Sequence, residues 1–142
     1  MATVFDVAQY ILELHGSMTT MKLQKLVYYC QAWHIAWTDN ILFSSRIEAW
    51  ADGPVVPDLF RRHQGSLRIS SLREADSSRL SKIEKNTIKK VMTFYGDKSP
   101  QWLIDLTHQE APWRDARSGV PDRAISNQVI TREAMGRFYS SL

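Results

Sequence analysis

The sequence has 142 residues, enough for about one domain with a substantial hydrophobic core. Its 44% apolar and 23% charged content, with five each of Trp, Tyr and Phe, is typical of a folded globular protein and argues against disorder. No apolar run approaches the roughly 20 residues of a membrane span, and the N-terminal segment carries Asp6 and Glu13 with no basic leader. We therefore expect a cytoplasmic protein without membrane contact.

The net charge of +3 conceals an uneven distribution along the chain. Residues 1–60 contain three Lys or Arg and six Asp or Glu, whereas residues 61–90 contain nine and three. A basic middle segment could contact nucleic acid or an acidic partner, but it is also an ordinary solubilising surface. On charge alone we favour the solubilising surface.

The first predicted helix begins after Thr3. Thr3 and Asp6 have the spacing of a capping box, and Val4 begins an apolar stripe at helical spacing. Gly16 is typical of the residue that ends a helix.

The second predicted helix covers about residues 20–37 and is expected at the centre of the fold. In its early turns Leu23 and Leu26 are expected to face inward, while Lys22 and Lys25 face solvent. The rest of the segment is apolar or aromatic on almost every side, so neighbouring elements must cover it.

Residues 41–52 predict a small β-hairpin, because short stretches alternate between apolar and polar side chains. The following DGPVVP sequence is expected to break the hairpin, and Pro57 suits the first turn of a short helix. Residues 64–80 are rich in Ser and Arg and predict an exposed loop.

Three more helices are predicted over about residues 81–96, 99–108 and 131–139. Ser81 with Glu84 forms a capping box for the first of them. The predicted fold is mainly α: a compact single domain over residues 1–142, built around the central helix, with the hairpin as its small β element.

Cys30 and His34 stand four residues apart on the central helix and share a face, which would suit a Cys–His dyad or half of a metal site. We favour a buried, inert cysteine, because the helix is apolar and zinc needs three or four ligands. As the only cysteine, Cys30 excludes an internal disulfide. No recognised catalytic or nucleotide-binding motif is present, so neither an enzyme nor a cofactor is expected.

Residues 107–117, THQEAPWRDAR, could be a reaction centre or a polar joint between two helices. We favour the joint. His108 can bond the last carbonyls of one helix, Glu110 can face the N-terminus of the next, and Pro112 forces a turn. Trp113 can bury its ring and donate its N–H to a carbonyl, with the two arginines that follow in solvent.

Three segments of the chain resemble one protein family. Residues 18–32 are similar to its M.KLQKL.YY.QA helix, residues 42–43 with 48–56 to LF…EAW..GPV, and residues 106–113 to LTH.E.PW. The family is the Panacea, or SocA-like, phage-associated domain of bacterial toxin–antitoxin systems. The motif residues, expected to be structural or partner-binding, are Lys22, Leu23, Gln24, Lys25, Leu26, Tyr28, Tyr29, Glu48, Trp50, Gly53, Pro54, Val55, Thr107, His108, Glu110, Pro112 and Trp113.

The resemblance implies an antitoxin that neutralises a cognate protein toxin by direct contact; some members look like adaptors that deliver the toxin to a protease such as a Clp-type machine. Two alternatives come from the residues themselves. One is a DNA-binding phage regulator that uses residues 61–90, and the other is a hydrolase that uses His108 and Glu110. The sequence shows no helix-turn-helix pattern with a basic recognition helix, so nucleic acid is the less favoured partner.

Overall fold

A computed structural model describes residues 2–121 and 123–142 as a mainly α structure, as predicted. Its helices are α1 (Val4–His15), α2 (Thr20–Thr38), α3 (Pro57–His63), α4 (Lys82–Tyr95), α5 (Pro100–Gln109), α6 (Ala111–Ala116) and α7 (Arg132–Ser140), with a 3-10 turn at Ser77–Arg79. The strands are β1 (Met18–Thr19), β2 (Glu48–Trp50), β3 (Gly53–Val55) and β4 (Arg68–Ile69). No helix among the described residues is long and apolar enough to cross a membrane.

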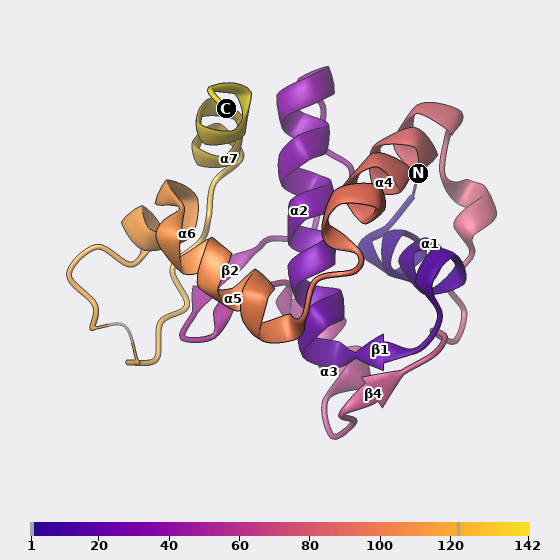
Figure 1. Ribbon diagram of the computed structural model, residues 1–142, viewed down its shortest axis with the longest axis horizontal. Helices are drawn as coiled ribbons and strands as arrows, with labels where there is room; N and C mark the ends of the chain where they lie inside the picture. Colours follow the sequence, from indigo (N-terminus) through magenta and orange to yellow (C-terminus); the bar gives the residue numbers. More distant parts are fainter. Residues whose placement is uncertain (1, 122) are drawn as a thin grey trace.

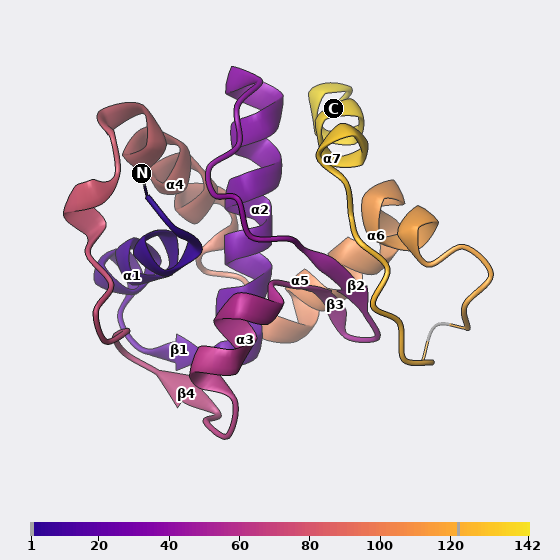
Figure 2. The same ribbon diagram turned by 180° about the vertical axis from the view of Figure 1, so that it is seen from behind.

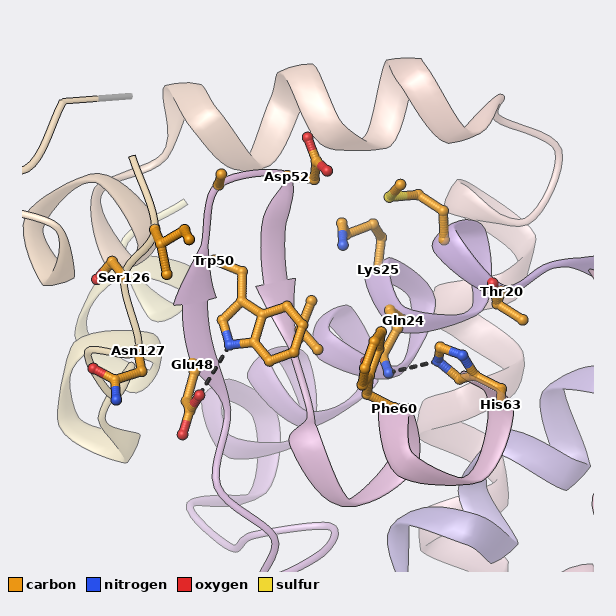
Figure 3. A pocket seen from close by; sticks show the side chains of 14 residues that line it. Thr20, Gln24, Lys25, Glu48, Trp50, Asp52, Phe60, His63, Ser126 and Asn127 are labelled. Carbon is orange, nitrogen blue, oxygen red and sulfur yellow. Dashed lines mark hydrogen bonds between the residues drawn. The ribbon is translucent and has the colours of Figure 1, made fainter. Parts of the chain in front are cut away.

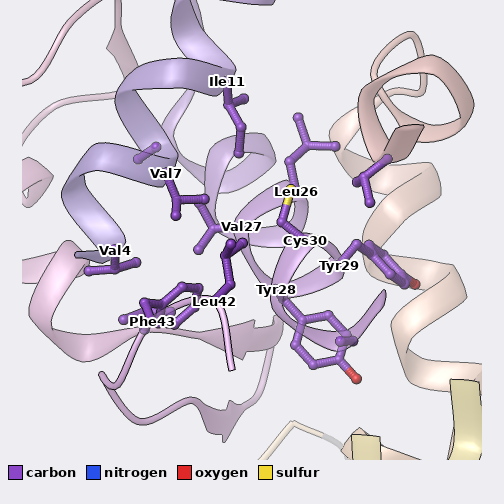
Figure 4. Packing of buried hydrophobic residues seen from close by; sticks show 14 of the residues in the cluster. Val4, Val7, Ile11, Leu26, Val27, Tyr28, Tyr29, Cys30, Leu42 and Phe43 are labelled. Carbon is purple, nitrogen blue, oxygen red and sulfur yellow. The ribbon is translucent and has the colours of Figure 1, made fainter. Parts of the chain in front are cut away.

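Helix α2 is the central element, as its composition predicts. It stands between α1 and α4 on one side and α6 and α7 on the other, and α5 crosses it (Figures 1 and 2). The Thr19 side chain accepts a hydrogen bond from the Lys22 amide at its start, and Asp39 ends it in the left-handed conformation. The core around it contains Val4, Val7, Ile11, Leu26, Val27, Tyr28, Tyr29, Cys30, Leu42 and Phe43 (Figure 4).

The predicted helix starts agree with the structure. Asp6 accepts a hydrogen bond from the Thr3 amide at 2.9 Å, and the capping box of Ser81 and Glu84 opens α4. Gly16 follows α1 with φ of 90°, a conformation that L side chains rarely adopt. These signals act within four residues, which is why the sequence alone reveals them.

The predicted hairpin is present, but its boundaries at 41–52 were wrong. The paired residues are 48–50 and 53–55, so the sequence expected to break the hairpin supplies its second strand. Residues 42–43 cannot pair with a strand, because the Gln31 side chain accepts from the Leu42 amide at 2.6 Å and donates to the Phe43 carbonyl at 2.7 Å. Ala49 and Pro54 are opposite each other, and their main-chain groups bond outside the hairpin. The Ala49 amide donates to the Gln128 carbonyl, and Pro54, which has no N–H, accepts from Lys25 through its carbonyl.

Most residues of the segment 64–80 are exposed, as predicted, but the segment also contains a short strand and two buried leucines, Leu72 and Leu80. Strand β4 pairs antiparallel with β1. Side chains of α1 hold this segment: the Leu72 amide donates to Gln9, and the Asp76 amide donates to Asp6. Contacts over more than sixty residues decide this packing, so local composition could not indicate it.

Candidate functional site

Gln24 and His63 form a buried polar pair that joins α2 to α3. The Gln24 amide group accepts from the Val56 N–H at 2.9 Å and donates to the Val56 carbonyl at 3.3 Å, as a neighbouring strand would. Its nitrogen also lies 2.9 Å from His63 Nε2. Burial lowers the pKa of His63, which favours the neutral imidazole that can accept this hydrogen bond.

Lys25 lies inside the protein, which corrects the prediction that it faces solvent. Its side chain is fully buried beneath strand β3, and its amine donates to the Pro54 carbonyl at 3.1 Å. The strand can lie this close because residue 53 is glycine: a Cβ there would lie 2.8 Å from Lys25 Cε. Burial lowers the pKa of Lys25 to about 7, against the opposing attraction of Asp52. The related prediction for Lys22 was also wrong, since this residue is only 9% exposed.

A cavity of about 540 Å³ opens beside Lys25. Figure 3 shows the Lys25 amine directed toward the space between Trp50 and Asp52. Most of its surface is apolar and comes from Met21, Trp50, Ala51, Val55, Phe60 and Ile125. The polar residues that line it are Thr20, Gln24, Lys25, Glu48, Asp52, His63, Ser126 and Asn127. A half-open apolar cavity with a few polar groups is the usual form of a ligand or partner site.

Glu48 fixes the position of the large aromatic side chain in this cavity. One carboxylate oxygen accepts from Trp50 Nε1 at 2.9 Å, and the other accepts from Arg46 Nε at 2.6 Å. The ring of Phe60 meets that of Trp50 edge to face, with the centroids 5.0 Å apart. The Trp50 ring is therefore held in place at the mouth of the cavity.

Glu110 forms a second polar cluster deeper in the fold, which corrects the expectation that it faces the N-terminus of the next helix. One of its oxygens accepts hydrogen bonds from Tyr29 at 2.7 Å and Tyr139 at 2.8 Å, and the Tyr139 hydroxyl lies 3.0 Å from that of Tyr28. Burial raises the pKa of Glu110, and the two tyrosine hydrogen bonds oppose that rise. The cluster connects α2, α6 and α7 through side chains far apart in the sequence.

The joint predicted at residues 107–117 is present. Trp113 is buried, and its N–H donates to the Trp50 carbonyl at 2.8 Å. His108 stacks on Trp113, with ring centroids 3.9 Å apart and planes 11° from parallel. Thr107 is buried beside Gly53: a Cβ added at residue 53 would lie 3.0 Å from the Thr107 hydroxyl oxygen. The third motif segment therefore packs against the second.

Arg117 was wrongly predicted to be an ordinary solvated arginine. It is 3% exposed and donates to the carbonyls of Ala49, Pro121 and Ala124 at 2.9, 2.8 and 2.6 Å. These contacts attach the chain after α6 to strand β2. No sequence signal indicates this role, because the guanidinium donates to main-chain carbonyls, which every residue type carries.

The expected inert environment of Cys30 agrees with the structure. Cys30 is fully buried and burial raises its pKa, while His34 turns to Thr87, with 2.8 Å between Nδ1 and the hydroxyl. Among the described residues there is no group of three or more His, Cys, Asp or Glu side chains placed to hold a metal ion.

The three motif segments thus fold into one unit. The apolar members Leu23 and Leu26 lie in the core, the polar members fix the hairpin to α2, and Trp113 fixes α6 to the hairpin. Phe60 and His63 of α3 and residues 125–127 line the cavity from outside the motifs, and no spacing in the sequence indicates them.

This is a mainly α domain in which the first two motif segments, α3 and residues 125–127 line an apolar cavity. The sequence pattern of the family described as antitoxin SocA-like, Panacea domain, matches residues 23–114. The chain therefore belongs to the SocA-like antitoxin family with a Panacea domain, which confirms the resemblance. No curated protein and no solved structure matches the chain.

Proposed function

We propose that the chain is an antitoxin that acts in the cytoplasm by binding its cognate toxin directly, and that the face around the Lys25 cavity contacts the toxin. Family membership supports the antitoxin role. The observation that carries the choice of face is the apolar cavity together with the exposed apolar side chain on its rim. Ile125 is 97% exposed and lines the cavity. Exposed apolar surface beside a cavity is a feature of protein-binding sites.

The contacts of residues 61–90 do not favour DNA as the partner. Arg79 pairs with Asp6 at 3.3 Å, and Arg61 pairs with Asp58. Arg62 lies over the ring of Phe5. Several of the guanidinium groups that a phosphate backbone would require therefore already have partners within the chain.

The environments of His108 and Glu110 likewise favour binding over hydrolysis. His108 stacks on Trp113, whereas Glu110 accepts hydrogen bonds from tyrosine hydroxyls. A general acid–base pair has to face one common reacting atom. These contacts suit a structural joint.

The test is co-expression with the product of the adjacent gene, read as growth rescue and as co-purification. Ile125→Asp should reduce both, because it places a charge on the proposed contact face. Ile83→Asp is the matched control: Ile83 is 66% exposed, lies on α4 and does not line the cavity, so this variant should rescue like the parent. If both variants rescue growth equally well, the face around the Lys25 cavity does not contact the toxin. If the toxin level falls during rescue only while a Clp-type protease is present, the chain acts as an adaptor.

A further inference from the structure

The amine of Lys25 has hydrogen-bonding capacity beyond its contact with the hairpin. A lysine ammonium has three N–H donors. Among the described residues, its one hydrogen-bond partner is the Pro54 carbonyl at 3.1 Å. The side chain is fully buried, so bulk water does not surround the other donors as it would at a surface lysine. Lys25 is among the residues that line the cavity, and Figure 3 shows its amine on the cavity side.

The other buried polar groups of the cavity are engaged within the chain, whereas Asp52 and Asn127, which also line it, are exposed. Both Glu48 oxygens accept hydrogen bonds, and the Gln24 amide is bonded to the main chain of Val56 and to His63. Lys25 is therefore the buried polar group best placed to bind an incoming acceptor.

Lys25 is the one Lys or Arg among the described residues that line the cavity, and this cation favours an anionic acceptor. Two carboxylates also line the cavity, and one of them, Glu48, already pairs with Arg46 at 2.6 Å. Asp52 is the carboxylate that attracts the Lys25 ammonium, but it is exposed on the hairpin turn and forms no ion pair within 4.0 Å among the described residues. A buried cation without a close counter-ion is costly, and a carboxylate brought to it forms a strong, charge-assisted hydrogen bond. The walls formed by Met21, Val55 and Phe60 are apolar and suit an apolar group of the ligand.

We propose that the cavity binds an apolar group of the partner protein that carries a carboxylate, and that the carboxylate accepts hydrogen bonds from Lys25 Nζ. This inference rests on the proposed antitoxin function and specifies the feature of the toxin that is recognised. The carboxylate belongs to an Asp or Glu beside an apolar residue, or to an apolar C-terminal residue. Both sources supply the same chemistry, and the test separates them.

Binding is coupled to protonation of the lysine. Burial lowers the pKa of Lys25 to about 7, so at pH 8 the amine of the free protein is mostly neutral. A bound carboxylate favours the ammonium, and the complex therefore takes up a proton from solution. About one pH unit below the pKa the amine of the free protein is mostly charged, so the uptake is smaller there.

The experiment uses the full chain and two libraries of random peptides displayed on phage. One library ends in a free C-terminus, and the other places the random segment within a longer chain. Peptides selected on the parent protein should contain a carboxylate next to apolar residues. Enrichment from the first library alone identifies a chain end, and enrichment from the second identifies a side chain. Selected peptides without a carboxylate, or no enrichment in either library, would overturn the proposal.

Variants then test the role of Lys25 with synthetic copies of the selected peptides. Lys25→Met should weaken binding at least tenfold, and amidation or Gln/Asn replacement of the peptide carboxylate should weaken binding to the parent similarly. Calorimetry at pH 8 in buffers of different ionisation enthalpy should show proton uptake approaching one per peptide in the parent and none in Lys25→Met. The role of Lys25 in binding the carboxylate is refuted if folded Lys25→Met binds the peptides as well as the parent does. It is also refuted if the parent takes up no proton on binding.

The rim residue gives a test that does not depend on replacing a buried side chain. Ile125→Asp should weaken peptide binding more than Ile125→Lys, because only the aspartate repels an acidic ligand. Equal effects would contradict an acidic ligand. The antitoxin function has a separate readout: if Lys25→Met and both rim variants still bind the toxin and rescue growth, this inference fails while the antitoxin role stands.

Discussion

Gly53 gives the sharpest test of how the hairpin is fixed over α2. Its φ is 108°, in the region that favours glycine, and a Cβ would lie 2.8 Å from Lys25 Cε and 3.0 Å from Thr107 Oγ1. Gly65 provides the matched control: its φ is 90°, but a Cβ there would have no heavy atom within 4 Å. Replacing each by alanine separates the cost of backbone conformation from the cost of close packing.

The expected magnitudes differ by the packing contribution. Gly65→Ala should lower the free energy of unfolding by about 1–2 kcal/mol, the cost of a left-handed conformation for a residue with a Cβ. Gly53→Ala adds overpacking of about 1–3 kcal/mol, giving a total of about 2–5 kcal/mol. Lys25 cannot simply move aside, because it is fully buried and bonded to Pro54. For a chain of this size, 1 kcal/mol corresponds to about 3 °C in melting temperature.

The assay is urea denaturation with thermal melting, followed by circular dichroism. In a Lys25→Ala background the extra cost of Gly53→Ala should fall, because the nearest atom is gone, whereas the cost of Gly65→Ala should not change. If Gly53→Ala and Gly65→Ala cost the same in the parent protein, the close approach of β3 to Lys25 does not constrain residue 53.

Glu110→Ala should cost about 2–5 kcal/mol, since it leaves two buried tyrosine hydroxyls without their acceptor, whereas Glu110→Gln retains an acceptor oxygen and should cost less. Burial raises the pKa of Glu110 in the folded state. The protonated Glu110 side chain therefore stabilises the fold below the unfolded pKa of about 4.3, and this stabilisation decreases as pH rises through the folded pKa. Urea titrations at successive pH values should show this decrease in the parent and not in Glu110→Gln. Trp113→Ala should cost about 3–5 kcal/mol by melting and weaken neutralisation through that loss, because the ring is buried and bonded to the Trp50 carbonyl. His108→Gln should retain most toxin binding and rescue; a variant that melts like the parent and binds the toxin yet fails to rescue would indicate a reaction at His108. Cys30 should react with thiol reagents only after denaturation, since it is fully buried and its pKa is raised, so rapid labelling of the native protein would contradict the structure.

The sequence by itself determined the elements whose causes are local. Capping residues placed the starts of α1 and α4, and Pro57 and Pro100 marked those of α3 and α5, because a cap or a first-turn proline acts within one turn of its helix. The nearly continuous apolar surface of residues 27–37 was enough to place α2 at the centre, since only neighbouring elements can cover such a helix.

Only the tertiary structure decided which polar residues lie inside. Lys25 and Glu110 have ordinary solvent-facing patterns in the sequence, and they are buried because strand β3 and the tyrosines of α2 and α7 supply their partners. Arg117 is buried for the same reason, by carbonyls from separate segments. The free energy of burying a polar group depends on partners distant in the chain, so neither periodicity nor spacing can reveal it. The cavity beside Lys25 is a consequence of that packing.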